Sequence, residues 1–130
     1  MSQIAEIVDN LQDLLFLEPA KQEDIRNIEN ELKLTLAEEY KEYLLKYGAV
    51  IAENVELTGI AKSKDRNVIS VTKREWEVND KIKHDMYVVE NLGIDGIMIW
   101  QESSGKIYES MPNCDAKLIA GSLAEYLKEK

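Results

Sequence analysis

The chain has 130 residues, a formal net charge of −9 at pH 7 and a single cysteine, Cys114. This length suits one domain over residues 1–130 that builds its core without disulfides, and one cysteine excludes an intramolecular disulfide and a Cys/His zinc framework. The negative charge argues against nucleic acid or an anionic membrane as a direct ligand, whereas a basic partner would be attracted.

The first residues do not have the composition of an export signal, because Glu6 and Asp9 stand where such a signal needs basic residues and then an apolar run. No apolar stretch approaches the ~20 residues that span a bilayer. We therefore expect a soluble, cytoplasmic protein.

The acidic residues are concentrated in the first half of the chain. Residues 1–60 contain 13 acidic and 5 basic residues, whereas residues 61–130 contain 12 acidic and 11 basic residues. Any acidic docking face is expected in the first half, unless the excess of carboxylates serves solubility alone.

Two helices are predicted before residue 33. The first follows from an apolar stripe at helical spacing, formed by Ile4, Ile7, Val8, Leu11, Leu14 and Leu15. Pro19 interrupts the pattern, and Glu23 and Asp24 then suit the positive end of a second helix. The inner residues of this second helix are Ile25, Ile28 and Leu32.

Residues 31–48 are predicted to form one complete helix with a marked start and end. Thr35 and Glu38 have the spacing of a capping box, in which a hydroxyl and a carboxylate accept from backbone donors of the first turn. One face of this helix carries Tyr40, Tyr43, Leu44 and Tyr47. Gly48 suits the left-handed conformation that ends a helix, and the tyrosine face is expected to be core.

The spacing of apolar residues along the chain changes after Gly48. Residues 49–52 and 55–60 predict a hairpin around Glu53 and Asn54. A helix through Val68 and Trp76 follows, capped by Asn67 or Asp65, although the sequence Val68-Ile69-Ser70-Val71 also has strand propensity.

The rest of the chain predicts a meander and a closing helix. Strands are expected at 86–90, 97–102 and 106–109, separated by turns that contain glycine. The middle strand is apolar on both faces, so we expect it to be central to its sheet, with Trp100 in the core. Ser122 begins a closing helix whose inner residues are Leu123, Tyr126 and Leu127. The fold class is thus α+β, with N-terminal helices packed on a mainly antiparallel sheet.

Few residues have the types or spacing of known catalytic sites. His84 is the only histidine, so neither a Ser/His/Asp triad nor an HExxH zinc site is available. The sequence Gly93-Ile94-Asp95-Gly96 connects two predicted strands and lacks the helix N-terminus that would hold a phosphate. We expect no catalytic residue, no cofactor and no metal, although composition alone leaves a site made of carboxylates open.

Trp76 lies among Lys73, Arg74, Glu75 and Glu77. A partly exposed aromatic side chain among charges has the composition of a binding hot spot. The alternative is burial on the inner side of its helix.

The residue pattern of the whole chain resembles the SUKH superfamily, a domain of yeast cell-wall-assembly regulators and of many bacterial immunity proteins. The resemblance rests on Ile25, Ile28, Glu29, Leu32, Leu36, Tyr40, Tyr43, Leu44, Leu45, Tyr47, Gly48, Tyr87-Val88-Val89-Glu90, Ile107-Tyr108-Glu109 and residues 122–127. Ala37 stands where the family usually has proline, and the first helix lacks the tryptophan often found near the family's N-terminus.

The resemblance implies a non-catalytic domain, in bacteria most often an immunity protein that neutralises a cognate toxin, frequently a nuclease. We therefore expect an acidic and aromatic surface that binds a basic toxin domain. The residues expected to contact it are Glu38, Glu39, Glu42, Glu53, Glu56, Trp76 and Glu77. A regulatory scaffold that binds signalling proteins, or a carboxylate-dependent enzyme with a deep pocket, are the alternatives.

Overall fold

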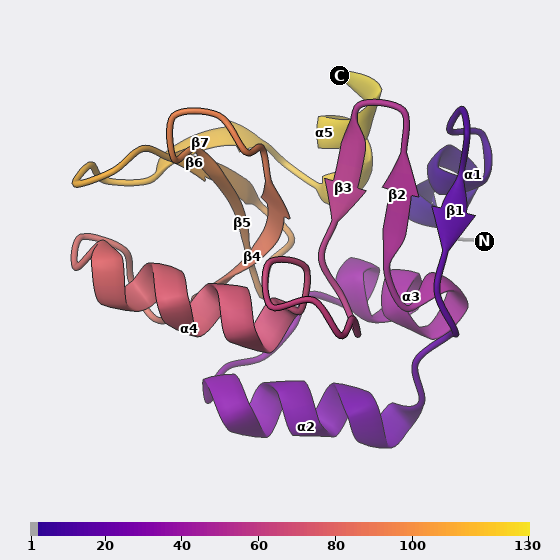
Figure 1. The fold of residues 1–130 in the computed structure, drawn as a ribbon, viewed down its shortest axis with the longest axis horizontal. Coiled ribbons are helices and arrows are strands. Elements are labelled where there is room, and N and C mark those ends of the chain that lie inside the picture. The colour runs from indigo at the N-terminus through magenta and orange to yellow at the C-terminus, as the bar shows by residue number, and fades with distance from the viewer. Residues whose placement is uncertain (1–2) are drawn as a thin grey trace.

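The computed structural model describes residues 3–130, which form five helices and one seven-stranded antiparallel sheet (Figure 1). The helices are α1 (Gln3–Asp9), α2 (Gln22–Leu32), α3 (Glu38–Tyr47), α4 (Val68–Val78) and α5 (Leu123–Lys128). The strands are β1 (Leu15–Phe16), β2 (Val50–Ala52), β3 (Val55–Leu57), β4 (Met86–Asn91), β5 (Met98–Glu102), β6 (Ile107–Ser110) and β7 (Lys117–Ala120). They lie in the sheet in chain order, which confirms the α+β prediction and leaves β1 and β7 as its two edges.

Alternate residues of the central strands pack on opposite faces of the sheet. Tyr87 and Ile99 belong to the large core cluster, which also contains residues of α1, α3 and α5. Val88 and Trp100 point the other way and pack with Val71 of α4. Trp100 is fully buried, as predicted, and its indole Nε1 donates to the Ser110 hydroxyl at 2.8 Å. Helices α3 and α4 therefore cover opposite faces of the sheet.

The tyrosine face of α3 is core, as predicted. Tyr40, Tyr43 and Tyr47 are all buried. The Tyr43 hydroxyl donates to the backbone carbonyl of Thr58 at 2.7 Å, and the Tyr40 hydroxyl is 2.8 Å from the Thr58 hydroxyl. Burial raises the pKa of both tyrosines, since the ionised form loses its solvation. Gly48 ends the helix with a positive φ of 74°, as predicted, but its ψ of −58° lies outside the left-handed helical region.

The predicted start of this helix is wrong. Residues 31–48 are not one helix, because α2 continues to Leu32 and α3 begins only after Ala37. No side chain caps α3, and Thr35 is exposed. The residues before α3 are instead held by distant groups. The Leu36 N–H donates to Glu29 Oε2 and the Ala37 N–H donates to the Tyr87 hydroxyl, both at 2.9 Å.

The predicted first helix is too long, because α1 ends at Asp9. Leu15, a residue of the predicted stripe, and its neighbour Phe16 pair instead with Ile51 and Val50 of β2. Asp13 adopts a positive φ of 56° between the two elements and so redirects the chain.

The structure also contains a strand that the sequence pattern did not indicate, β7, formed by residues 117–120.

The remaining elements form where they were predicted, except that β3 ends at Leu57 and does not extend to residue 60. The β2–β3 hairpin turns at Glu53 and Asn54, where Asn54 has a φ of 63°. The Asn67 side chain caps α4 by accepting from the backbone N–H groups of Ile69 and Ser70. Strands β4, β5 and β6 form the meander, and Ser122 caps α5.

Candidate protein-interaction surface

Among the described residues, no helix covers one face of strands β1–β3 (Figure 1). Paired residues on neighbouring antiparallel strands share a face, so Leu15, Ile51 and Glu56 form one row across β1, β2 and β3. The other face of the same strands carries Val50 and Leu57, which are buried in the large core cluster. Figure 1 shows β1–β3 in front, with no helix between them and the viewer.

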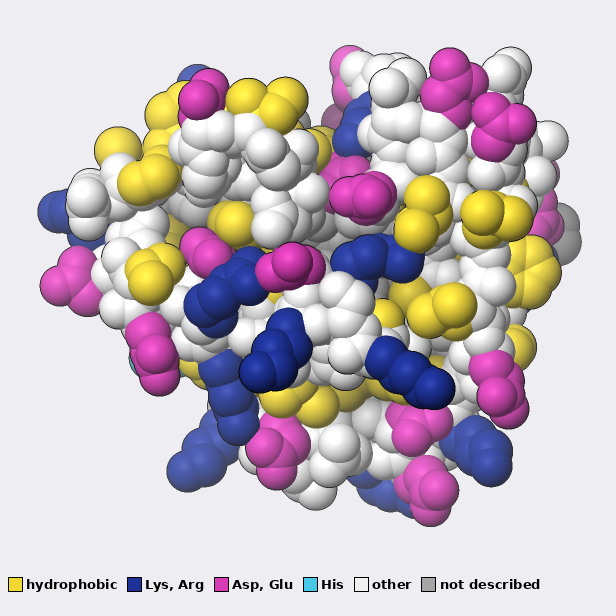
Figure 2. Space-filling view, in the orientation of Figure 1, with side chains coloured by type: hydrophobic (Ala, Val, Ile, Leu, Met, Phe, Trp, Pro, Cys, Tyr) yellow, Lys and Arg dark blue, Asp and Glu magenta, His cyan; other side chains and the backbone are white. Residues whose placement is uncertain are grey.

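We call this surface the open face and define it as Leu15, Leu17, Ile51 and Glu56, with Glu53 in the adjoining turn. Leu15 and Leu17 are 68% and 42% exposed, which is unusual for large apolar side chains. In Figure 2 hydrophobic side chains are spread over the area of β1–β3, and acidic side chains gather at the end where the hairpin turns. An apolar patch with a charged rim is the usual composition of a protein-binding surface.

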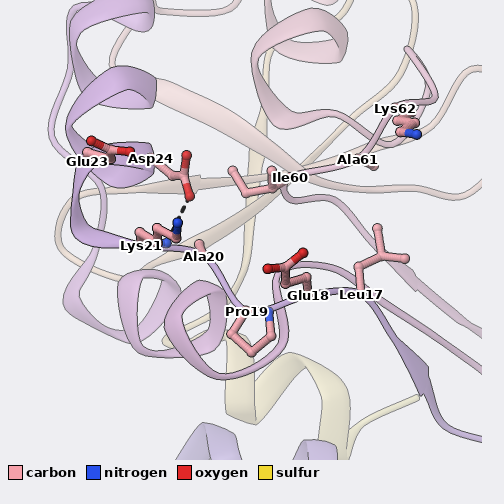
Figure 3. Close-up of a pocket in the computed structure, with 10 residues that line it drawn as sticks. All are labelled: Leu17, Glu18, Pro19, Ala20, Lys21, Glu23, Asp24, Ile60, Ala61 and Lys62. Carbon is pink, nitrogen blue, oxygen red and sulfur yellow. Dashed lines mark hydrogen bonds between the residues drawn. The ribbon is translucent and has the colours of Figure 1, made fainter.

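A hollow of about 620 Å³ adjoins the open face at Leu17 (Figure 3). It lies between residues 17–24 and 60–62. Leu17, Ile60 and Ala61 line it with apolar groups, and Figure 3 shows the Glu18 carboxylate directed toward Ile60. The Asp24 side chain forms a hydrogen bond at the start of α2, where its Oδ2 accepts from the Lys21 N–H at 2.9 Å. The recess is thus apolar at Leu17, Ile60 and Ala61, and charged side chains of both signs border it, namely Glu18, Glu23, Asp24, Lys21 and Lys62.

A second hollow, of about 430 Å³, lies at the hairpin end of the open face. Strands β3 and β4 pair only at Leu57 and Glu90, so they diverge beyond that point and leave a gap. Glu90 is 2% exposed and accepts from the Glu56 N–H, the Tyr126 hydroxyl and Lys130 Nζ at 2.6 to 2.7 Å. The Glu90 carboxylate thus joins α5 to the divergent strands, and the Glu56 carboxylate remains exposed at the rim.

The structure separates the seven residues expected to contact a partner. Glu53 and Glu56 are exposed on the hairpin, at the open face. Glu38 and Glu42 are exposed on α3. Trp76 and Glu77 are on α4, and α3 and α4 cover opposite faces of the sheet. One compact interface therefore cannot include all three groups, and only the hairpin pair adjoins exposed apolar side chains of the open face.

Glu39 has internal partners for both of its carboxylate oxygens. Oε1 accepts from the Leu123 N–H at 2.7 Å and from Gln101 Nε2 at 2.9 Å, and Oε2 accepts from the Ala124 N–H at 2.9 Å. Leu123 and Ala124 are the first residues of α5, where the helix leaves backbone donors unpaired and favours a negative charge. Glu39 therefore positions α5, a role that reasoning from sequence missed.

Trp76 is only partly exposed and packs against both core clusters. Its ring stacks on the exposed His84 ring with centroids 4.2 Å apart, and its indole Nε1 is buried without a hydrogen-bond partner among the described residues. The side chain is therefore largely occupied by contacts within the molecule.

The sequence analysis assigned Leu15 to the stripe of the first helix and placed Leu17 in no element, so it missed their exposure on the open face. A signal was present in the run Leu14-Leu15-Phe16-Leu17, which has no helical period and stops just before Pro19. Such a run fits a short strand as well as the end of a helix.

Within residues 3–130 no group of three or more His, Cys, Asp or Glu side chains is arranged to hold a metal ion. Over the same residues, none of the helices has the length and apolar character needed to cross a membrane.

Comparison with known families agrees with the fold and with the residue pattern. Residues 4–130 match the SUKH_5 family, described as SMI1-KNR4 cell-wall. Because the match covers nearly the whole chain, this protein belongs to the SMI1-KNR4 family of the SUKH superfamily. A search of curated proteins gave no match.

Proposed function

We propose that this chain is an immunity protein that binds and neutralises a cognate bacterial toxin, a basic nuclease domain, through the open face. It acts as a non-catalytic inhibitor in the cytoplasm. Its family includes immunity proteins, and its charge of −9 favours a basic partner. The observation that carries the proposal is the exposed apolar row beside Glu53 and Glu56, since a soluble domain gains nothing in its own fold from leaving Leu15 68% exposed.

The two kinds of side chain on this surface have different roles in binding. Leu15, Leu17 and Ile51 supply apolar area whose removal from water stabilises a complex. Glu53 and Glu56 supply a negative potential that attracts a basic surface and speeds its encounter. A nuclease is basic where it binds its nucleic acid, so an acidic protein that covers this site would also block the substrate.

The proposal is tested by expressing the chain together with the protein encoded by the neighbouring gene, which we expect to contain the toxin domain. We expect a stoichiometric complex on size exclusion, loss of nuclease activity in that complex, and growth of cells that otherwise die from the toxin. Leu15→Lys should abolish the rescue, whereas the equal charge change Leu118→Lys on β7 should not. Leu118 is 53% exposed on the opposite edge of the sheet and is therefore a matched control. Failure of the unaltered chain to bind or to rescue would refute the proposal.

The cell-wall description of the family favours one second candidate, a non-catalytic scaffold that binds regulatory proteins. The same co-expression and complex isolation distinguishes the two candidate functions. Capture of cell-wall or signalling proteins through the open face, without any toxic partner or rescue of growth, would support the scaffold.

A further inference from the structure

We propose that the toxin binds by adding an extended strand to the free edge of β1, and that this strand carries apolar residues with Lys or Arg at both ends. This inference rests on the proposed function and specifies how the open face is used. Strand addition joins two chains through backbone hydrogen bonds along an unpaired sheet edge.

The backbone of β1 has the required orientation. The Leu17 N–H donates to the Ala49 carbonyl at 3.1 Å, and Leu15 lies opposite Ile51, so both residues direct their backbone groups toward β2. These groups alternate along an antiparallel strand. The N–H and carbonyl of Phe16 therefore point away from β2, to the side where residues 3–130 add no further strand to the sheet.

The side chains at this edge also differ from those of a protected edge. Natural proteins guard edge strands with charges, proline or a covering loop. Here three consecutive large apolar residues are exposed, because Phe16 is 56% exposed between Leu15 and Leu17. The Phe16 ring packs edge-on against the Tyr47 ring, with the ring centroids 5.7 Å apart. An added strand would cover Leu15 and Leu17 on the open face and Phe16 on the other face.

Charge identifies the occupant as a different protein and not a second copy of this chain. The exposed carboxylates of Asp13 and Glu18 flank the apolar residues at both ends of β1. Two copies would bring these acidic ends together and would also oppose their net charges of −9. A strand with a basic residue at each end meets the same carboxylates favourably. Pro19 has no N–H to donate, so the added strand pairs with the residues that precede it.

A proline substitution tests the backbone contact directly. Phe16→Pro removes the outward N–H and leaves the bonds between β1 and β2 in place, whereas Phe16→Ala removes the ring and keeps the N–H. With the toxin domain of the neighbouring gene as probe, we expect Phe16→Pro to bind about tenfold more weakly than Phe16→Ala, the effect of losing a backbone hydrogen bond and its alignment. Urea unfolding of both variants reports whether the fold is intact.

Hydrogen exchange of the unaltered chain gives a second readout that needs no variant. The Phe16 amide should exchange freely in the free chain and become protected in the complex. Equal affinity of Phe16→Pro and Phe16→Ala, or a Phe16 amide that stays unprotected in the complex, would overturn strand addition and leave the immunity function standing. Absence of any complex with the unaltered chain would overturn both. A dimer of the chain alone that Phe16→Pro abolishes would show that the occupant is a second copy.

Discussion

Glu39 on α3 caps helix α5 by accepting the Leu123 N–H at 2.7 Å, across 84 residues of sequence. The same carboxylate accepts the Ala124 N–H at 2.9 Å and also binds Gln101. Gln101 in turn accepts from the hydroxyl of Tyr87, the residue that holds the start of α3. One carboxylate thus connects the beginnings of two helices through the central strands.

Glu39→Ala should therefore lower stability and not merely affinity. It leaves two backbone N–H groups of α5 without their acceptor and takes one of two acceptors from the Gln101 amide, which keeps the Gly105 carbonyl, so we expect a loss of about 2 to 3 kcal/mol in the free energy of unfolding. Urea denaturation of the free protein measures it. Glu38→Ala is the control, because the Glu38 side chain is 87% exposed, and its change should stay within about 0.5 kcal/mol. Equal effects of the two substitutions would show that Glu39 does not position α5.

The buried tyrosines should make the protein unfold in alkali. Burial raises the pKa of Tyr40, Tyr43 and Tyr87 above the ordinary value of 10.0, and burial and then Glu90 do the same for Tyr126. A raised pKa in the folded state contributes stability that is fully present below the unfolded pKa and is lost as the pH rises. Above pH ~10 each of these tyrosines should lower the free energy of unfolding by about 1.4 kcal/mol per pH unit.

The measurement follows tyrosinate absorbance and far-ultraviolet circular dichroism on one pH titration. Tyrosinate from the buried side chains should appear together with the loss of secondary structure. The chain in concentrated urea serves as reference and should titrate near the ordinary pKa. Ionisation of most tyrosines while the helical signal persists would contradict this account.

Gly48 and Gly93 allow a test of why the chain turns where it does. Both have positive φ angles, 74° and 71°, so alanine is strained at either position. A Cβ on Gly48 would lie 2.1 Å from the Glu18 carbonyl oxygen, whereas one on Gly93 meets no described atom within 4 Å. Gly93→Ala should cost about 1 kcal/mol, and Gly48→Ala about 3 kcal/mol or more, because a steric clash adds to the strain. Thermal unfolding compares them, and equal losses would mean that segment 17–18 moves freely.

The acidic residues of the hairpin should control the rate at which the proposed toxin partner associates. Reversal of both charges, by Glu53→Lys and Glu56→Lys, should lower the association rate constant about tenfold at low salt, with a smaller effect at high salt. Glu38→Lys with Glu42→Lys makes the same charge change on α3, on the other side of the sheet, and should have a weaker effect. Stopped-flow mixing with the toxin domain measures both pairs. If both pairs slow association equally, the association rate depends on the net charge of the protein and not on carboxylates at the open face.

Local patterns were sufficient for many elements of the fold. The tyrosine stripe of α3, the hairpin at Glu53 and Asn54, the Asn67 cap and the β4–β6 meander all depend on residues within a few positions of one another. For the interaction surface, the sequence indicated acidic residues but not which of them remain free. Glu39 and Glu56 are both glutamates in the helical first half, and only their contacts distinguish a structural carboxylate from an exposed one.

The class of fold, the family and the inner face of each main helix could be read from the amino-acid sequence, since apolar spacing, caps and glycine turns act over short stretches of chain. The three-dimensional structure was needed to show that Leu15 and Phe16 form an exposed edge strand, because their partners Ile51 and Val50 lie far along the chain. It also decided where α3 begins, since the hydroxyl of Tyr87 and the carboxylate of Glu29 take the place of a local cap. A backbone group accepts whichever partner the folded chain brings within reach, and a local pattern cannot specify a partner that is distant in sequence.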